Sequence, residues 1–127
     1  MSESCALGTL EAIHLKVVEA LPDAAIAINS QGEIIVFNAE AEFMFGYTRE
    51  EVLGKTIEML LPESVRLAHE NHREGWFAEP KTREMGTGQP LQGLHKAGKS
   101  FPVQIKLARI IVPDAGVHGL AIVRRVK

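Results

Sequence analysis

The stretch from Ala24 to Thr48 constrains the fold of this chain more than any other part of the sequence. Two short apolar segments, residues 24–29 and 33–38, flank the turn Ser30-Gln31-Gly32, and a short helical pattern then ends at Gly46. This arrangement predicts a β-hairpin, because glycine supplies the backbone dihedrals that a tight turn needs. We therefore expect an antiparallel sheet with helices packed on it.

The composition fits one small domain, since 127 residues of which 46% are hydrophobic can bury one ordinary core. The formal net charge of −2 and the isoelectric point near 6.2 provide no basic field, so we expect no nucleic-acid binding. No apolar run approaches the ~18 residues of a membrane span, and the N-terminus lacks the pattern of a signal peptide. Cys5 is the only cysteine. We therefore expect a cytoplasmic protein without membrane insertion.

Residues 9–21 are predicted to form a helix that precedes the folded domain. Thr9 can cap this helix, and its apolar residues recur at a 3-4-3 spacing that makes a narrow stripe of Leu10, Ile13, Val17 and Ala20. A helix of this length is marginal alone, so the stripe must lie on its own sheet or on a second copy. We divide the chain into a flanking helix at 1–21 and a domain at 22–127.

Helices are predicted for the middle of the chain. A helix over residues 39–45 ends at Gly46, and Thr48 with Glu51 has the spacing of a capping box for the next helix, which Gly54 ends.

Residues 57–61 form a further turn, and Pro62 then starts a long helix from Glu63 to about Phe77. Four of its residues recur at spacings of four, three and four and are predicted to share one face: Val65, His69, His72 and Trp76.

Strands are predicted for the last third of the chain. Residues 88–95 and 100–111 are joined by a turn at 96–99, and after a turn at 112–116 the last strand covers 117–126. Strand alternation predicts that Phe101, Val103, Ile105 and Leu107 point inward. The fold class is therefore α+β, an antiparallel sheet with helices on one side. The expected apolar lining between them is Ile26, Ile28, Val36, Met59, Leu60, Val65, Leu91, Ile105, Leu107, Leu120 and Ile122.

Several local motifs occur in one register along the chain: Asn38, Gly46-Tyr47 with Glu50-Glu51, Val52 to Lys55, Leu61-Pro62 and Lys96 to Val103. From Leu21 to Val126 the chain resembles a PAS domain, a sensory module. The resemblance implies a five-stranded antiparallel sheet with helices on one face and an N-terminal flanking helix. The chain departs from the family at Arg125, where an aspartate usually couples the core to an effector helix. Either the chain is a sensor cut at its output end or its signalling contact differs.

Within PAS domains the pattern resembles the haem-binding oxygen sensors. Arg66 to His69 matches the segment that carries their proximal histidine, which implies that His69 holds the iron of haem b. Thr87 and Gln89 fall in the matching distal loop, where those sensors carry a methionine near the first position or an arginine at the second. As a neutral amide, Gln89 would bind a gas ligand more weakly than arginine.

Other interpretations of these residues remain open. His69 can simply cap or pack the helix, and His69 with His72 has metal-ligand spacing but no evident third ligand. Trp76 is expected to close the core end of the long helix, with stacking on a flat cofactor as the alternative. The covalent flavin and coumaroyl types need a cysteine inside the domain, whereas Cys5 lies outside it. Non-covalent FAD stays open without a positive signal, and the core can also fill itself.

No motif of a nucleotide-binding loop, a serine hydrolase or a zinc protease occurs, so we expect no enzyme activity. The resemblance implies a module that binds a small ligand or gas and controls a fused or partner signalling output. It also implies a homodimer through the helix at residues 9–21. The alternative is a cofactor-free PAS domain that acts in dimerisation and protein interaction.

Overall fold

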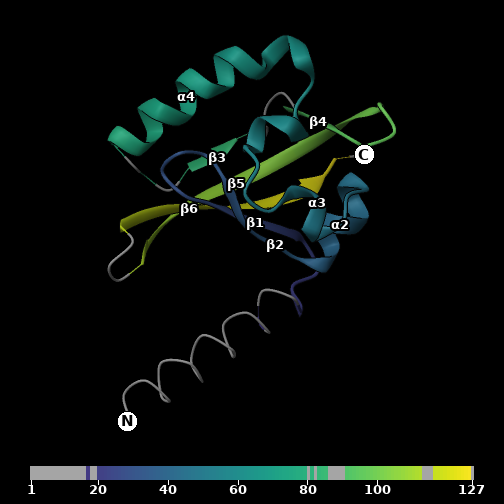
Figure 1. Cartoon of the computed structure of the whole chain (residues 1–127), viewed down its shortest axis with the longest axis horizontal. Coiled ribbons are helices and arrows are strands. Elements are labelled where there is room, and N and C mark those ends of the chain that lie inside the picture. The colour runs from purple at the N-terminus through teal and green to yellow at the C-terminus, as the bar shows by residue number, and fades with distance from the viewer. Residues whose placement is uncertain are drawn as a thin grey trace, which may run out of the picture.

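The computed structural model describes residues 17, 20–79, 81, 83–85, 91–112 and 116–126. Its strands are β1 (Ala24–Ile28), β2 (Ile34–Phe37), β3 (Arg83–Met85), β4 (Leu91–Leu94), β5 (Ser100–Val112) and β6 (Gly116–Arg125). Its helices are α2 (Ala39–Phe45), α3 (Arg49–Val52) and α4 (Arg66–Ala78), with 3₁₀ turns η1 (Ile57–Leu60) and η2 (Glu63–Val65). The predicted α+β class is confirmed (Figure 1).

The strands form one antiparallel sheet in the order β2-β1-β6-β5-β3, with β4 also paired to β5. β6 occupies one edge of β5 from Val103 to Val112, while β3 pairs with Ile105 to Leu107 and β4 with Ser100 to Val103. The two short strands must therefore share the other edge of β5. The six strands therefore occupy five positions across the sheet, which agrees with the predicted five-stranded sheet.

One face of the sheet carries the hydrophobic core. Ile26 pairs with Ala121, which also pairs with Leu107, so these three side chains lie on the same face. The helices pack on this face through Phe45 of α2 and Val52 of α3, and α4 crosses the sheet above it (Figure 1). The fully buried members of the core include Phe37, Ile26, Ile34, Leu60 and Val52.

The predicted inward position of three lining residues is wrong. Leu120 pairs with Ala27 and Ala108, Ile122 pairs with Ala25, and Val36 pairs with Ala27. Because these positions alternate with the core-facing ones, Leu120, Ile122 and Val36 lie on the outer face of the sheet. Two further members of the predicted lining, Val65 and Leu91, are 44% and 38% exposed.

The start of α2 is fixed by a buried asparagine. The side chain of Asn38 accepts hydrogen bonds from the backbone N–H of Ala25 and of Ala41, both at 2.9 Å, and donates to the carbonyl of Asp23 at 3.1 Å. It therefore caps the helix and ties it to β1. The predicted end at Gly46, with φ of 81°, and the capping box of Thr48 with Glu51 are both confirmed.

The long helix differs from its prediction in two ways. Residues 63–65 form the separate 3₁₀ turn η2, and α4 starts at Arg66. The buried residues of α4 are Arg73 and Trp76, whereas His72 is exposed. The buried face of α4 therefore includes Arg73 and Trp76 and leaves out His72, which differs from the predicted face of Val65, His69, His72 and Trp76. Arg73 can be buried because its guanidinium pairs with the carboxylate of Glu58.

Two predicted elements, the strand at 88–95 and the helix at 9–21, differ from the structure or are only partly described by it. The strand predicted at 88–95 is β4 at Leu91–Leu94, and the sequence prediction missed β3. Of the predicted helix at 9–21, Val17, Ala20 and Leu21 are among the described residues; Val17 and Ala20 have helical backbone and are exposed, whereas Leu21 is half-buried and not helical. The rest of that helix lies outside the described residues, so the predicted division at residue 21 stays a prediction.

Candidate functional site

A buried carboxylate connects η1 to α4. Oε2 of Glu58 lies 2.6 Å from Nδ1 of His69 and accepts a hydrogen bond from Nε of Arg73 at 3.0 Å. Its Oε1 accepts a second bond from the Arg73 guanidinium at 3.1 Å. Glu58 and Arg73 are 7% and 8% exposed, whereas the His69 side chain is about one-third exposed. The three residues form a charged cluster whose histidine reaches solvent.

The charge of Glu58 fixes the tautomer of His69. Burial raises the pKa of the Glu58 carboxyl, but hydrogen bonds from Arg73 and His69 outweigh this effect and hold the pKa below its usual value. Glu58 is therefore an ionised acceptor at neutral pH, and Nδ1 of His69 must carry the proton it donates. In neutral His69 the lone pair then resides on Nε2.

The cluster also depends on the β1–β2 turn. Gly32 has φ of 80°, and a Cβ atom built on it would lie 2.3 Å from Cζ of Arg73. Any side chain at position 32 would therefore displace the guanidinium from Glu58 as well as strain the turn. The sequence prediction assigned Gly32 to the turn alone and did not include Glu58 or Arg73. The one available signal was their spacing from His69, with Arg73 one helical turn after it.

The other predicted site residues divide between the two faces of the sheet. Trp76 is buried, donates from Nε1 to the carbonyl of Lys81 at 2.8 Å, and meets Phe77 edge-on at 4.9 Å. Ile105 packs against the core, and Leu107 shares its face of the sheet. Leu120 lies on the outer face, so its assignment to the same pocket is wrong.

The predicted distal residues Thr87 and Gln89 lie outside the described residues. Within the described part of the chain, no group of three or more histidine, cysteine, aspartate or glutamate side chains could hold a metal ion.

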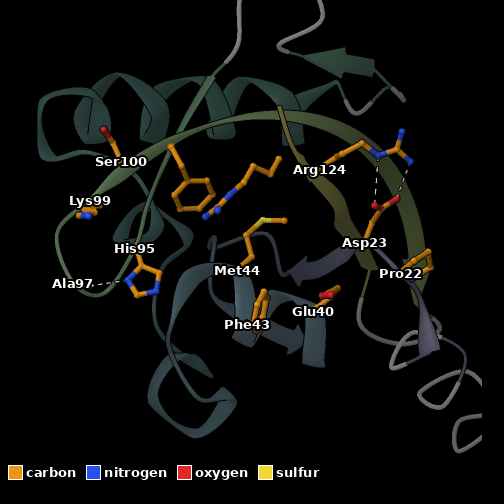
Figure 2. Close-up of a pocket in the computed structure, with 12 residues that line it drawn as sticks. Pro22, Asp23, Glu40, Phe43, Met44, His95, Ala97, Lys99, Ser100 and Arg124 are labelled. Atoms are coloured by element: carbon orange, nitrogen blue, oxygen red, sulfur yellow. Dashed lines mark hydrogen bonds and ion pairs between the residues drawn. The ribbon is translucent and has the colours of Figure 1, made fainter. Parts of the chain in front are cut away.

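A second feature is an open groove of about 870 Å³ at the other end of the core (Figure 2). It lies between α2, the turn that joins β4 to β5, and the end of β6. Its walls include Phe43 and Met44 from α2, Lys99 from the turn, and the ion pair of Asp23 with Arg124. The groove is separate from the cluster at Glu58.

A model of the PAS fold matches residues 15–123 of this chain. The chain belongs to the PAS family. It is 36% identical over 104 residues to the oxygen sensor protein DosP of Escherichia coli, a match that covers 79% of this chain and 12% of DosP. It is 28% identical over 105 residues to the sensor protein FixL of Bradyrhizobium diazoefficiens, covering 83% of this chain and 21% of FixL. The chain therefore spans only a small part of these relatives.

Solved structures support the same fold at low sequence identity. The PAS domain of an HTR-like protein from Haloarcula marismortui superposes with a TM-score of 0.75 at 18% identity and covers 98% of both chains. A PAS domain from Colwellia psychrerythraea superposes with a TM-score of 0.73 at 22% identity, and the match covers 92% of this chain and 97% of that domain's chain. Among the described residues, no helix has the length and apolar character needed to cross a membrane.

Proposed function

We propose that this PAS domain is a sensory module that binds a small ligand between α4 and the sheet and thereby controls a signalling output. The observation that carries the proposal is the position of His69, whose Nδ1 lies 2.6 Å from the buried carboxylate of Glu58. A carboxylate in this position fixes the ring and its tautomer, so that Nε2 is available to a ligand. The module senses and does not catalyse.

Haem is the specific candidate, because the donor chemistry at His69 fits it. Histidine ligands of metals commonly donate their other ring N–H to a carboxylate, which is the bond that His69 makes to Glu58. His69 would hold the iron, and bound haem would supply an open coordination position for a gas. The similarity to the oxygen sensor DosP supports this candidate. Gln89 and Thr87 are proposed to face the gas side.

An absorbance spectrum after haem reconstitution tests this candidate. The wild-type protein is expected to show a Soret band that His69→Ala abolishes. His72→Ala is the matched control, since His72 is the exposed histidine of the same helix, and it should keep the band. An unchanged spectrum in His69→Ala would contradict the assignment. Gln89→Ala should change the rate of gas dissociation but not the haem content.

A second candidate, a cofactor-free PAS domain for protein interaction, is favoured by the position of Trp76. A Cβ atom built on Gly119 of β6 would lie 3.3 Å from the Trp76 ring and 3.4 Å from Ile28. The indole therefore bridges α4 to the sheet and fills space there with protein atoms. A wild-type protein that stays colourless after reconstitution and carries no ligand in native mass spectrometry would support this candidate.

We further propose that two copies pair through the predicted N-terminal helix and that the output is a fused domain or a partner protein. This chain matches only 12% of the length of DosP and 21% of the length of FixL. These small fractions support a signalling output that lies outside the residues of this chain. The apolar outer face of the sheet, with Ala25, Leu120 and Ile122, supports a covering element on that side.

A further inference from the structure

The groove of Figure 2 has an apolar floor that the fold leaves uncovered. Phe43 of α2 is 84% exposed, the highest value for any large apolar side chain among the described residues. Met44 and Phe101 line the same groove, and Phe101 is 7% exposed. A solvent-exposed phenylalanine beside other apolar groups is typical of a contact surface.

Two cationic side chains at this groove, Lys99 and Arg125, have no carboxylate partner among the described residues. The Arg125 guanidinium lies 4.5 Å from the centre of the Phe101 ring, and Lys99 lines the groove from the β4–β5 turn. Within the described residues neither makes an ion pair. Arg124 differs from them, because its guanidinium is paired with Asp23 at 3.0 Å. Glu40 is the remaining acidic residue of the lining, so two positive charges face one negative charge.

We propose that this groove docks a peptide segment of a partner protein, and that the segment carries a large apolar side chain next to an aspartate or glutamate. The apolar side chain would cover Phe43 and Met44, and the carboxylate would pair with Arg125 and Lys99. Arg125 suits this role because its planar guanidinium can bind a carboxylate with two hydrogen bonds while it stays stacked on Phe101.

The charge pattern and the shape of the groove favour a peptide over a small molecule. The groove is open to solvent, whereas small-molecule sites bury most of the ligand surface. At one side of the groove the start of β1 and the end of β6 lie next to each other, where Asp23 pairs with Arg124. A docked segment would therefore touch both of these adjacent strand ends. The inference does not depend on a ligand at His69.

A phage-displayed library of random dodecapeptides, selected on the immobilised chain, tests the proposal. The enriched peptides should contain a large apolar residue close to an acidic one. Their affinity, measured by fluorescence anisotropy, should fall at least about tenfold in Phe43→Ala and in Arg125→Glu. Leu67→Ala and Lys106→Glu are the matched controls, since both residues are exposed and lie outside the groove. Both controls should bind like the wild type.

A compensating change of charge makes the test specific. A peptide whose acidic residue is replaced by lysine should lose binding to the wild type and recover it with Arg125→Glu, provided that circular dichroism shows both proteins folded. The proposal is overturned if no peptide is enriched, or if the enriched peptides bind Phe43→Ala as tightly as the wild type. It is also overturned if Phe43→Ala converts a dimer to a monomer in sedimentation, because a second copy would then fill the groove.

Discussion

Glu58 fixes the position of two side chains of α4, and its buried charge makes the cluster sensitive to substitution. Arg73 makes two hydrogen bonds to this carboxylate and is 8% exposed. Removing one partner of a buried ion pair leaves the other charge without compensation, which costs more than the pair contributes. The cluster is therefore expected to depend on Glu58 for its geometry as well as for its charge.

Glu58→Gln is expected to lower the free energy of unfolding at neutral pH by roughly 3–5 kcal/mol, because Arg73 stays buried without an opposite charge. The folded-state pKa of Glu58 lies below its ordinary value of 4.5. The stabilisation is thus complete above that pH and is lost as the pH falls through the lower folded-state pKa. Urea unfolding at a series of pH values should show the two proteins converge in acid.

Glu51→Gln is the control for this experiment. Glu51 pairs with Lys96 at the surface and accepts the N–H of Thr48, an acceptor role that glutamine preserves. The hydrogen bond from Lys96 lowers the pKa of Glu51 as well, but this pair lies at the surface, so the change in the unfolding curve across the pH series should be much smaller than for Glu58→Gln. If the difference in free energy of unfolding between Glu58→Gln and the wild type does not change with pH, the lost stability comes from altered packing and not from the missing charge.

Single residues were predicted from the sequence where a local pattern defines them. The capping box at Thr48 and the end of α2 at Gly46 depend only on neighbouring residues. The partners Glu58 and Arg73 could not be found in this way, since charged residues are usually exposed and their contact joins positions 15 apart. His69 was singled out by family resemblance, and its contact with Glu58 needed the structure.

At the scale of elements, the pairing partners of β5 decide which of its side chains are buried. Ile105 pairs with Met85 and Val123, and Ile105 and Leu107 both lie on the core face. Strong alternation made this strand predictable. The inward and outward positions of β6 were not predictable, because its run from Gly119 to Val123 is continuously apolar and shows no alternation of period two. For that reason Leu120 was assigned to the wrong face.

Ile105→Ala and Leu107→Ala are each expected to lower the free energy of unfolding by about 2 kcal/mol, the low end of the range for core truncations, because both side chains are only partly buried. Lys106→Ala should be nearly neutral, since Lys106 is exposed on the outer face. Chemical denaturation of the three variants measures this ranking. A larger loss for Lys106→Ala than for its neighbours would mean that the register of β5 is shifted by one residue.

At the scale of the whole molecule, the two faces of the sheet differ in what covers them. The inner face is closed by α2, α3 and α4. The outer face carries Ala25 and Ala27, which are buried, and Leu120 and Ile122, which are half-buried. The sequence predicted a suitable element in the helix at residues 9–21, but no local pattern can say whether that helix lies on its own sheet or on a partner. That choice is a property of the assembly.

We expect the protein to form a homodimer in which the helix at residues 9–21 supplies much of the interface. Val17 is 56% exposed, so Val17→Glu should leave the monomer fold intact, but it would place a charge in a two-fold contact where identical patches meet. Sedimentation velocity should therefore show a shift from dimer to monomer for Ile13→Glu combined with Val17→Glu, and for deletion of residues 1–20, while circular dichroism keeps its sheet signal. Leu67→Glu is the control, since Leu67 is 73% exposed on α4 and should leave the dimer unchanged. A wild-type protein that sediments as a monomer at tens of micromolar would contradict the dimer and place the helix on its own sheet.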